Sequence, residues 1–380
     1  ARDEEVSMTP PATLAERANE QTAVTTAIRP FHVDVPEADL IDLRRRIEAT
    51  RLPDKETVAD FTQGVPLATV QKLTKYWATE YDWRKVEARL NAVPNFITEI
   101  DGLDIHFIHV RSKHENALPV IVTHGWPGSV VEQLKIIDPL TNPTAYGKSA
   151  SDAFDVVIPS MPGYGFSGKP ASTGWDAQRI ARAWSVLMER LGYTKFVAQG
   201  GDWGAIVTEL MATQGDPALI GIHTSMPNAV PADIDAAAGS RKPVPSGLSD
   251  EEQRAYERLA FFYTQVYYAF HMGTRPQTLV GLADSPVGLA TFMIDHDARS
   301  LELIARSFNG VAEGLTRDDV LDNVTLFWLT NTGVSAARLY WEYKLGFFSP
   351  KGVKIPVVVS SFPDDLYPMP RSWAERAYPK

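Results

Sequence analysis

The chain has 380 residues, 44% hydrophobic and 22% charged, a composition typical of a globular protein large enough to bury an α/β core with attached subdomains. Its net charge of -10, without a basic run, excludes nucleic acid and anionic membrane surfaces as expected partners. The absence of cysteine excludes disulfides, a thiol nucleophile and Cys-ligated metal. No apolar stretch approaches the roughly 18 residues of a membrane span, so none is expected.

The chain begins with Ala1 rather than Met, which fits either removal of an export signal or another kind of chain boundary. Export and a cytoplasmic location are therefore both left open, as is assembly into a homo-oligomer. Residues 1–26 are polar, without a durable apolar pattern, and are expected to form a surface arm. From residue 28 to about 94 apolar residues recur at helical spacing, for example over 36–47 and 70–77. Residues 1–94 are therefore interpreted as an arm followed by a helical N-terminal segment.

The pattern then changes to short apolar runs separated by turns. Residues 96–100 and 105–110 flank Gly102 and predict a hairpin. Nearly continuous β-branched runs predict buried parallel strands at 119–123, 155–159, 195–199 and 355–359, with helices such as 180–191 between them. We expect a doubly wound, mostly parallel sheet whose two parts span residues 95–228 and 332–380. Residues 229–331 are mostly helical after an Ala-, Pro- and Gly-rich connection, and are interpreted as an inserted cap.

The strand at 196–199 runs into Gly200-Gly201-Asp202-Trp203-Gly204, and a helical stretch follows. This is the strand, sharp turn and helix context of a nucleophile elbow, in which flanking glycines allow a strained turn to hold one side chain clear of the sheet. The simpler interpretation is that Asp202 only caps the following helix.

Two other loops favour the catalytic interpretation because they follow core strands in the order of an α/β-hydrolase fold. One contains His124-Gly125-Trp126 and the other spans 159–167. The backbone N–H groups of Trp126 and Trp203 are predicted to form an oxyanion hole. The ring of His124 is expected to brace its loop.

An aspartate at the elbow indicates the reaction class. With an ordinary pKa of about 3.9 it is already an anion at neutral pH and needs no activating base. Attack by serine on a saturated carbon would leave a stable ether, whereas a carboxylate leaves an ester that water can hydrolyse. The elbow therefore predicts epoxide opening or carbon–halogen displacement.

Four separated motifs, at 124–128, 200–204, 284–289 and 337–342, together resemble the microsomal-type epoxide hydrolase family over residues 28–380. The resemblance implies an α/β-hydrolase fold with a helical cap and a helical N-terminal segment. It also implies that an apolar epoxide becomes a vicinal diol through an alkyl ester on Asp202, which a histidine-activated water hydrolyses. No cofactor or metal is implied.

The resemblance assigns the epoxide oxygen to two tyrosines as proton donors. Tyr340 matches one of them, and Tyr268 is preferred for the other, with Tyr267 and Tyr263 as alternatives. Without the resemblance, packing in an aromatic cluster would be the simpler role for Tyr268. The acid that orients the base is assigned to Asp365 rather than its neighbour Asp364.

The base departs from the family pattern, which places the catalytic histidine one strand beyond the acid. The sequence has no histidine after His296, so no catalytic histidine is assigned. The last strand and helix are expected to be missing through truncation, proteolysis or incomplete coverage of the chain. His223 and His271 lie elsewhere and are interpreted as structural. If the chain were complete, the ester on Asp202 would persist.

Two alternatives remain open. A haloalkane dehalogenase also uses an elbow aspartate, and Trp203 is compatible with halide binding, whereas the Tyr340 motif favours an epoxide. A ligand-binding protein without turnover would account for the missing histidine. The substrate pocket is expected to draw on aromatic residues of the cap, namely Phe261, Phe262, Tyr263, Phe292 and Trp328.

Overall fold

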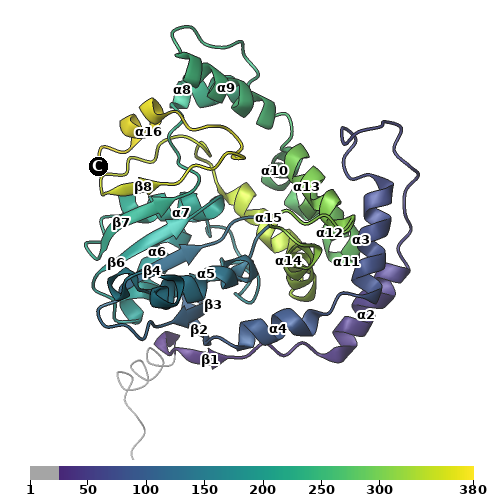
Figure 1. Ribbon diagram of the computed structural model, residues 1–380, viewed down its shortest axis with the longest axis horizontal. Helices are drawn as coiled ribbons and strands as arrows, with labels where there is room; N and C mark the ends of the chain where they lie inside the picture. The colour runs from purple at the N-terminus through teal and green to yellow at the C-terminus, as the bar shows by residue number, and fades with distance from the viewer. Residues whose placement is uncertain (1–24) are drawn as a thin grey trace, which may run out of the picture.

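The computed structural model describes residues 25–380 (Figure 1). The arm expected at residues 1–26 therefore lies, except for its last two residues, outside the described part. A sheet of eight strands runs through the molecule in the order β1-β2-β3-β5-β4-β6-β7-β8. The strand bounds are β1 (Arg29–Phe31), β2 (Asn95–Ile100), β3 (Leu103–Val110), β4 (Leu118–Thr123), β5 (Phe154–Pro159), β6 (Phe196–Gly200), β7 (Leu219–Thr224) and β8 (Val357–Val359).

The sheet is parallel from β5 through β4, β6 and β7 to β8, and antiparallel where β1, β2 and β3 extend it. The predicted hairpin is confirmed, with Ile97 opposite His106. The four predicted parallel strands are confirmed within two residues at their ends. An α/β-hydrolase fold with a mostly parallel sheet is thus the architecture of the chain.

Both faces of the sheet are covered because the strand residues alternate between two apolar clusters. Ile121 and Val157 pack with residues of α6 (Ala177–Arg190) and α7 (Trp203–Thr213). Val120 and Val156, one residue away, pack on the other face with residues of α4 (Trp83–Asn91) and α5 (Leu134–Thr141). This alternation accounts for the unbroken apolar runs in the sequence.

The N-terminal segment is helical as expected, but it begins with a strand that the helical pattern did not indicate. Strand β1 pairs with β2 at the edge of the sheet. Pro30 has no backbone N–H to donate, and an edge strand tolerates this because no further strand pairs with its outer side. Helices α2 (Glu37–Glu48), α3 (Leu67–Thr79) and α4 follow. The three residues of β1 are too few to show the alternation of apolar and polar residues that indicates a strand.

Helices fill the connection between β7 and β8 and lie to one side of the sheet (Figure 1). The predicted cap boundary at residue 331 stays a prediction, although helix continues beyond it. The helices are α8 (Ala232–Gly239), α9 (Asp250–Phe262), α10 (Tyr267–Thr274), α11 (Gly281–Asp284), α12 (Pro286–Ile294), α13 (Ala298–Phe308), α14 (Arg317–Leu329) and α15 (Gly333–Glu342).

The N-terminal helices pack along this helical insertion, with α2 and α3 beside α12 and α13 (Figure 1). Polar contacts join α3 and α4 to α14. Trp77 donates its indole N–H to Thr325 at 3.0 Å. Tyr81 and Arg89 both donate to the buried carboxylate of Asp322, at 2.8 and 2.6 Å. The N-terminal segment therefore holds the insertion as well as the sheet.

Beside β8 one face of the sheet is hollow. The hollow measures about 640 Å³ and its lining is mostly apolar, including Val120, Val197 and Ile222. Val358 on β8 is 63% exposed. Helix α16 (Arg371–Ala377) follows β8, and the backbone N–H of Val357 donates to the carbonyl of Lys380.

Candidate active site

Asp202 lies at the sharp turn between β6 and α7, at the carboxyl edge of the parallel strands. Its backbone has φ 52° and ψ -129°, a left-handed φ that non-glycine residues rarely adopt. Its side chain makes no capping hydrogen bond to α7. The capping interpretation therefore fails, and the strained turn presents the carboxyl group to the space above the sheet.

Glycines surround Asp202 because the backbones approach too closely for side chains. A Cβ at Gly200 would collide with the carbonyl of Gly204, and one at Gly204 would collide with the carbonyl of Thr123 on β4. A Cβ at Gly125 would collide with the side chain of Asp202 itself. The elbow and the loop after β4 are thus packed directly on each other.

That loop holds the Asp202 carboxylate with its backbone. The N–H of Trp126 donates to Oδ1 of Asp202 at 2.7 Å. Burial raises the pKa of Asp202 above its ordinary value, although the N–H groups of Trp126 and Trp203 and the ring of His296 oppose the rise. The two predicted oxyanion donors therefore both face this carboxyl group.

His124 braces the same loop. Its Nδ1 contacts the carbonyl of Gly125 at 3.0 Å, while its Nε2 accepts the backbone N–H of Met161 at 3.1 Å. Nδ1 must then carry the proton. Burial lowers the pKa of His124 to about 4, so the ring is a neutral structural link between two loops.

Two tyrosines from different helices stand over Asp202. Tyr268 on α10 and Tyr340 on α15 have ring centroids 6.2 Å apart at 87°. Tyr268 stacks on Trp126 at 4.8 Å, and Tyr340 meets Trp203 edge-on at 4.9 Å. Burial raises the pKa of each phenol well above its ordinary value of 10.0, so both keep their protons at neutral pH.

The two alternative tyrosines are placed differently. Tyr267 is 73% exposed. The hydroxyl of Tyr263 donates to Oδ1 of Asp235 at 2.5 Å. Tyr268 is therefore the candidate on α10 whose hydroxyl group lies at the site.

An aromatic chamber of about 150 Å³ opens over Asp202. Phe262 lines this chamber, whereas Phe261 is 61% exposed, Phe292 packs edge-on against Trp126, and Trp328 lies under the guanidinium of Arg46. Besides Asp202, the lining comprises Trp203, Phe262, Tyr263, Val266, Tyr268, Ala269, His296, Tyr340, Tyr343, Phe347, Phe348 and Leu366.

A second chamber of about 260 Å³, called the polar chamber because several aspartates and His296 line it, adjoins the same carboxyl group. Asp365, on the loop after β8, lines it together with Asp364, and the Asp365 carboxylate accepts the backbone N–H of Phe362 at 2.8 Å. Asp364 is exposed and pairs with Arg299. The side chains of Asp202 and His296 belong to both chambers.

His296 is the site residue that the sequence analysis did not assign. It lies in the connection between α12 and α13, and its Nε2 is 2.8 Å from the hydroxyl oxygen of Tyr268. The adjacent Asp297 was the available signal, but a His-Asp pair in a helical region does not show where it points. The two histidines considered earlier lie elsewhere: His223 is within β7 against Ser360, and His271 is exposed on α10.

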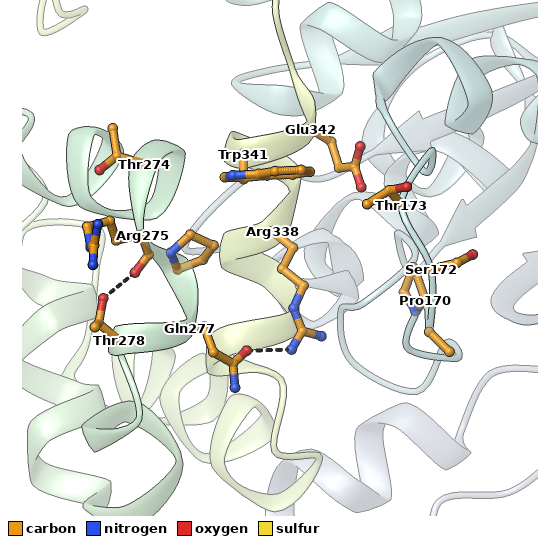
Figure 2. A pocket seen from close by; sticks show the side chains of 12 residues that line it. Pro170, Ser172, Thr173, Thr274, Arg275, Gln277, Thr278, Arg338, Trp341 and Glu342 are labelled. Carbon is orange, nitrogen blue, oxygen red and sulfur yellow. Dashed lines mark hydrogen bonds between the residues drawn. The ribbon is translucent and has the colours of Figure 1, made fainter.

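Helix α15 also borders a groove of about 720 Å³ on its other side (Figure 2). Arg338, Trp341 and Glu342 point into that groove, opposite Gln277 and the loop around Pro170. Neither Asp202 nor the two site tyrosines line it. The groove is larger than the chamber over Asp202, but it contains none of these three residues.

Within residues 25–380 no cluster of three or more His, Asp or Glu side chains is arranged to hold a metal ion. None of the helices in this range has the length and apolar character needed to cross a membrane.

Two family models match the chain. The model for the epoxide hydrolase N terminus matches residues 28–133, and the model for the alpha/beta hydrolase fold matches residues 119–272. The first covers α2 to α4 and the antiparallel strands, and the second includes the sharp turn at Asp202.

Curated relatives and solved structures share most of the length. A putative epoxide hydrolase of Stigmatella aurantiaca is 49% identical over 93% of this chain and 78% of the relative. Epoxide hydrolase 1 of Oryctolagus cuniculus is 34% identical over 93% of this chain and 82% of the relative. The crystal structure of juvenile hormone epoxide hydrolase from the silkworm Bombyx mori superposes with a TM-score of 0.80 at 28% identity, covering 95% of this chain and 89% of that one. The Aspergillus niger epoxide hydrolase superposes with a TM-score of 0.76 at 30% identity, covering 93% and 88%.

Proposed function

The chain belongs to the epoxide hydrolases, enzymes of the α/β-hydrolase fold, and from that premise we propose that Asp202 is the nucleophile that opens the ring. The observation that carries this assignment is the strained elbow, which holds a carboxyl group against two backbone N–H groups and beneath two phenols. Backbone strain of this kind persists only where the surrounding structure enforces it, and strained residues are concentrated at active sites.

In the first half-reaction an oxygen of the Asp202 carboxylate attacks one epoxide carbon, and the bond from that carbon to the ring oxygen breaks. Tyr268 and Tyr340 hold the ring oxygen, and one phenol transfers its proton to the forming alkoxide. Their burial supports this role, because a phenol with a raised pKa stays protonated until the alkoxide forms.

In the second half-reaction water attacks the ester carbonyl on Asp202. The N–H groups of Trp126 and Trp203 would then hold the developing oxyanion, since they already point at this carboxyl group. Water would approach through the polar chamber. Asp365 lines this chamber, which supports its assignment as the acid that orients the base.

The aromatic chamber supports an apolar epoxide, aryl or terpenoid, as substrate. Aromatic and aliphatic side chains make up most of the lining, so the part of the substrate away from Asp202 and the two phenols would meet mainly apolar groups. A haloalkane dehalogenase is not favoured, because the named relatives are epoxide hydrolases and a departing halide needs no proton from Tyr340.

The test is Asp202→Asn assayed with styrene oxide. Asparagine keeps the shape and tolerates the positive φ of the elbow, but it is not an anion. We expect diol formation to fall by about 10⁴-fold or more, and mass spectrometry to find the substrate adduct on the wild-type peptide containing Asp202 and not on the variant peptide.

Asp364→Asn, which removes an exposed carboxylate at the polar chamber, is the matched control and should retain turnover. Near-normal diol formation by Asp202→Asn would refute the nucleophile assignment. Release of halide from a matched chloroalkane, without diol formation from the epoxide, would favour dehalogenation instead.

A further inference from the structure

His296 stands in the wall between the aromatic and the polar chamber. Its ring lies beside Tyr268, with centroids 4.8 Å apart, and is nearly parallel to the ring of Trp126 at 6.2 Å and 28°. Only 17% of its side chain is exposed. The ring therefore touches a phenol of the site and also reaches the space from which water would approach.

Each ring nitrogen of His296 has a hydrogen-bond partner. Nε2 is 2.8 Å from the hydroxyl oxygen of Tyr268, and Nδ1 is 2.9 Å from Oδ2 of Asp297. A carboxylate accepts but cannot donate, so Nδ1 carries a proton and Nε2 is the atom that exchanges one with the phenol.

Asp297 is itself fixed. Its Oδ1 accepts the backbone N–H groups of Arg299 and Ser300 at the start of α13, and its Oδ2 accepts the Ser300 hydroxyl at 2.6 Å. Although burial opposes it, hydrogen bonds from His296 and Ser300 lower the pKa of Asp297 to about 2, so this carboxyl group is an anion at neutral pH. A buried, anchored carboxylate on Nδ1 holds an imidazole in one tautomer and orientation.

We propose that His296, oriented by Asp297, is a proton-relay residue that acts through Tyr268 and returns to it the proton given to the substrate. This proposal rests on the proposed function and adds to it a route between the phenol and the polar chamber. His296 is a positioning residue in this scheme, because the epoxide is contacted by Tyr268.

The protons balance over the cycle. When the carbon–oxygen bond of the epoxide breaks, the alkoxide takes the hydroxyl proton of Tyr268, and the phenolate takes a proton from Nε2 of the His296 imidazolium. Hydrolysis of the ester by water then yields the diol, the Asp202 carboxylate and one proton. That proton returns to Nε2 of His296 through the polar chamber.

Several charged or titratable groups face the ring of His296. Tyr268 faces it from α10, Asp202 from the elbow, and Asp295 and Asp297 from its own connection. Asp364 and Asp365 line the polar chamber from the loop after β8, and Arg299 pairs with Asp364. Because the relay needs a proton on Nε2, alkylation of Asp202 should slow as pH rises.

The test measures the rate of adduct formation on Asp202 after rapid mixing with styrene oxide, across a pH series, by intact-mass spectrometry. His296→Gln keeps an N–H donor for Tyr268 but cannot exchange a proton. We expect alkylation about 10- to 100-fold slower than wild type, with the alkaline decline lost. His271→Gln, on α10 but exposed and hydrogen-bonded toward Thr278, should match wild type at every pH.

Asp297→Asn is the second variant, because asparagine retains the helix cap but leaves Nδ1 without a carboxylate. Asp297→Asn should shift the alkaline decline in the alkylation rate, and it should slow alkylation less than His296→Gln does. If His296→Gln does not fold, the result for Asp297→Asn tests the relay. Rates and a pH profile unchanged in the folded variants, with adduct forming on wild-type Asp202, would overturn the relay alone. Diol formation without any adduct on wild-type Asp202 would overturn the nucleophile assignment and the relay with it.

Discussion

Tyr340 and Trp341 are neighbours in sequence whose side chains lie on different faces of α15. Tyr340 lines the chamber over Asp202 and packs edge-on against Trp203, while Trp341 lines the outer groove (Figure 2). Adjacent helix positions point about 100° apart, so one short helix separates the two environments. Substitutions at the two positions should therefore have different effects.

Tyr340→Phe removes one of the two proposed proton donors and leaves the ring in place. We expect the rate of alkylation to fall by about 100-fold, because the remaining phenol still assists the alkoxide. The rate is measured by adduct formation on Asp202 with styrene oxide. Trp341→Phe is the matched control, and alkylation should stay near the wild-type rate; equal losses in the two variants would contradict the role of the Tyr340 hydroxyl.

At the scale of elements, Asp297 joins two tasks, since it caps α13 and also holds His296. Asp297→Ala removes both functions, and loss of an N-cap costs about 1 kcal/mol. Asp297→Asn removes the charge but keeps a capping side chain. We expect urea unfolding to show a lower midpoint for Asp297→Ala than for Asp297→Asn.

Acid should weaken the contact between Asp297 and His296. The pKa of Asp297 is lowered from 3.8 to about 2, so its contribution to stability is complete above about pH 4 and is lost as pH falls through 2. The stability difference between wild type and Asp297→Asn should therefore shrink on acidification. A difference that is constant down to pH 2 would show that the charge of Asp297 adds nothing to stability.

The sequence predicted those elements in which apolar residues recur regularly or in which a motif is present. The elbow was predicted from its glycines, and the structure accounts for these glycines through collisions that any Cβ would make with the carbonyls of Gly204 and Thr123. Buried strands were found because both of their faces are apolar. Strand β1 was missed because three edge residues carry no pattern.

His296 was missed for a different reason. Its role depends on where the connection between α12 and α13 meets α10 and the elbow, and this tertiary arrangement has no signature in a single chain. The choice of Tyr268 over Tyr267 came from the family resemblance, and burial of one ring beside exposure of the other agrees with that choice.

At the scale of the whole molecule, the N-terminal helices and the helical insertion meet at Asp322 on α14. Burial raises the pKa of this carboxyl group from 3.8 to about 6, although hydrogen bonding from Tyr81 and the charge of Arg89 oppose the rise. Folded protein thus binds more protons here than unfolded protein between about pH 4 and 6, so stability at this position falls as pH rises through that window.

Arg89→Met should destabilise the protein by about 1–2 kcal/mol at pH 8, a value reduced because the arginine is 47% exposed. The loss should be smaller at pH 5, where Asp322 is largely protonated. Urea unfolding at both pH values measures the difference. Arg45→Met, which breaks an exposed pair with Asp42, is the matched control and should leave stability nearly unchanged at either pH. Equal losses from Arg89→Met at pH 5 and pH 8 would argue against a charged Asp322.

The carboxyl group of the site belongs to the sheet, whereas both phenols and the imidazole belong to the insertion. In the proposed mechanism the sheet therefore supplies the group that forms the covalent bond, and the insertion supplies the groups that donate and accept protons. Neither the sheet nor the insertion alone contains a working set of groups, so turnover reports whether the two are docked. Activity should consequently be lost at lower denaturant concentrations than those that unfold the sheet. Loss of activity would then report separation of the insertion from the sheet.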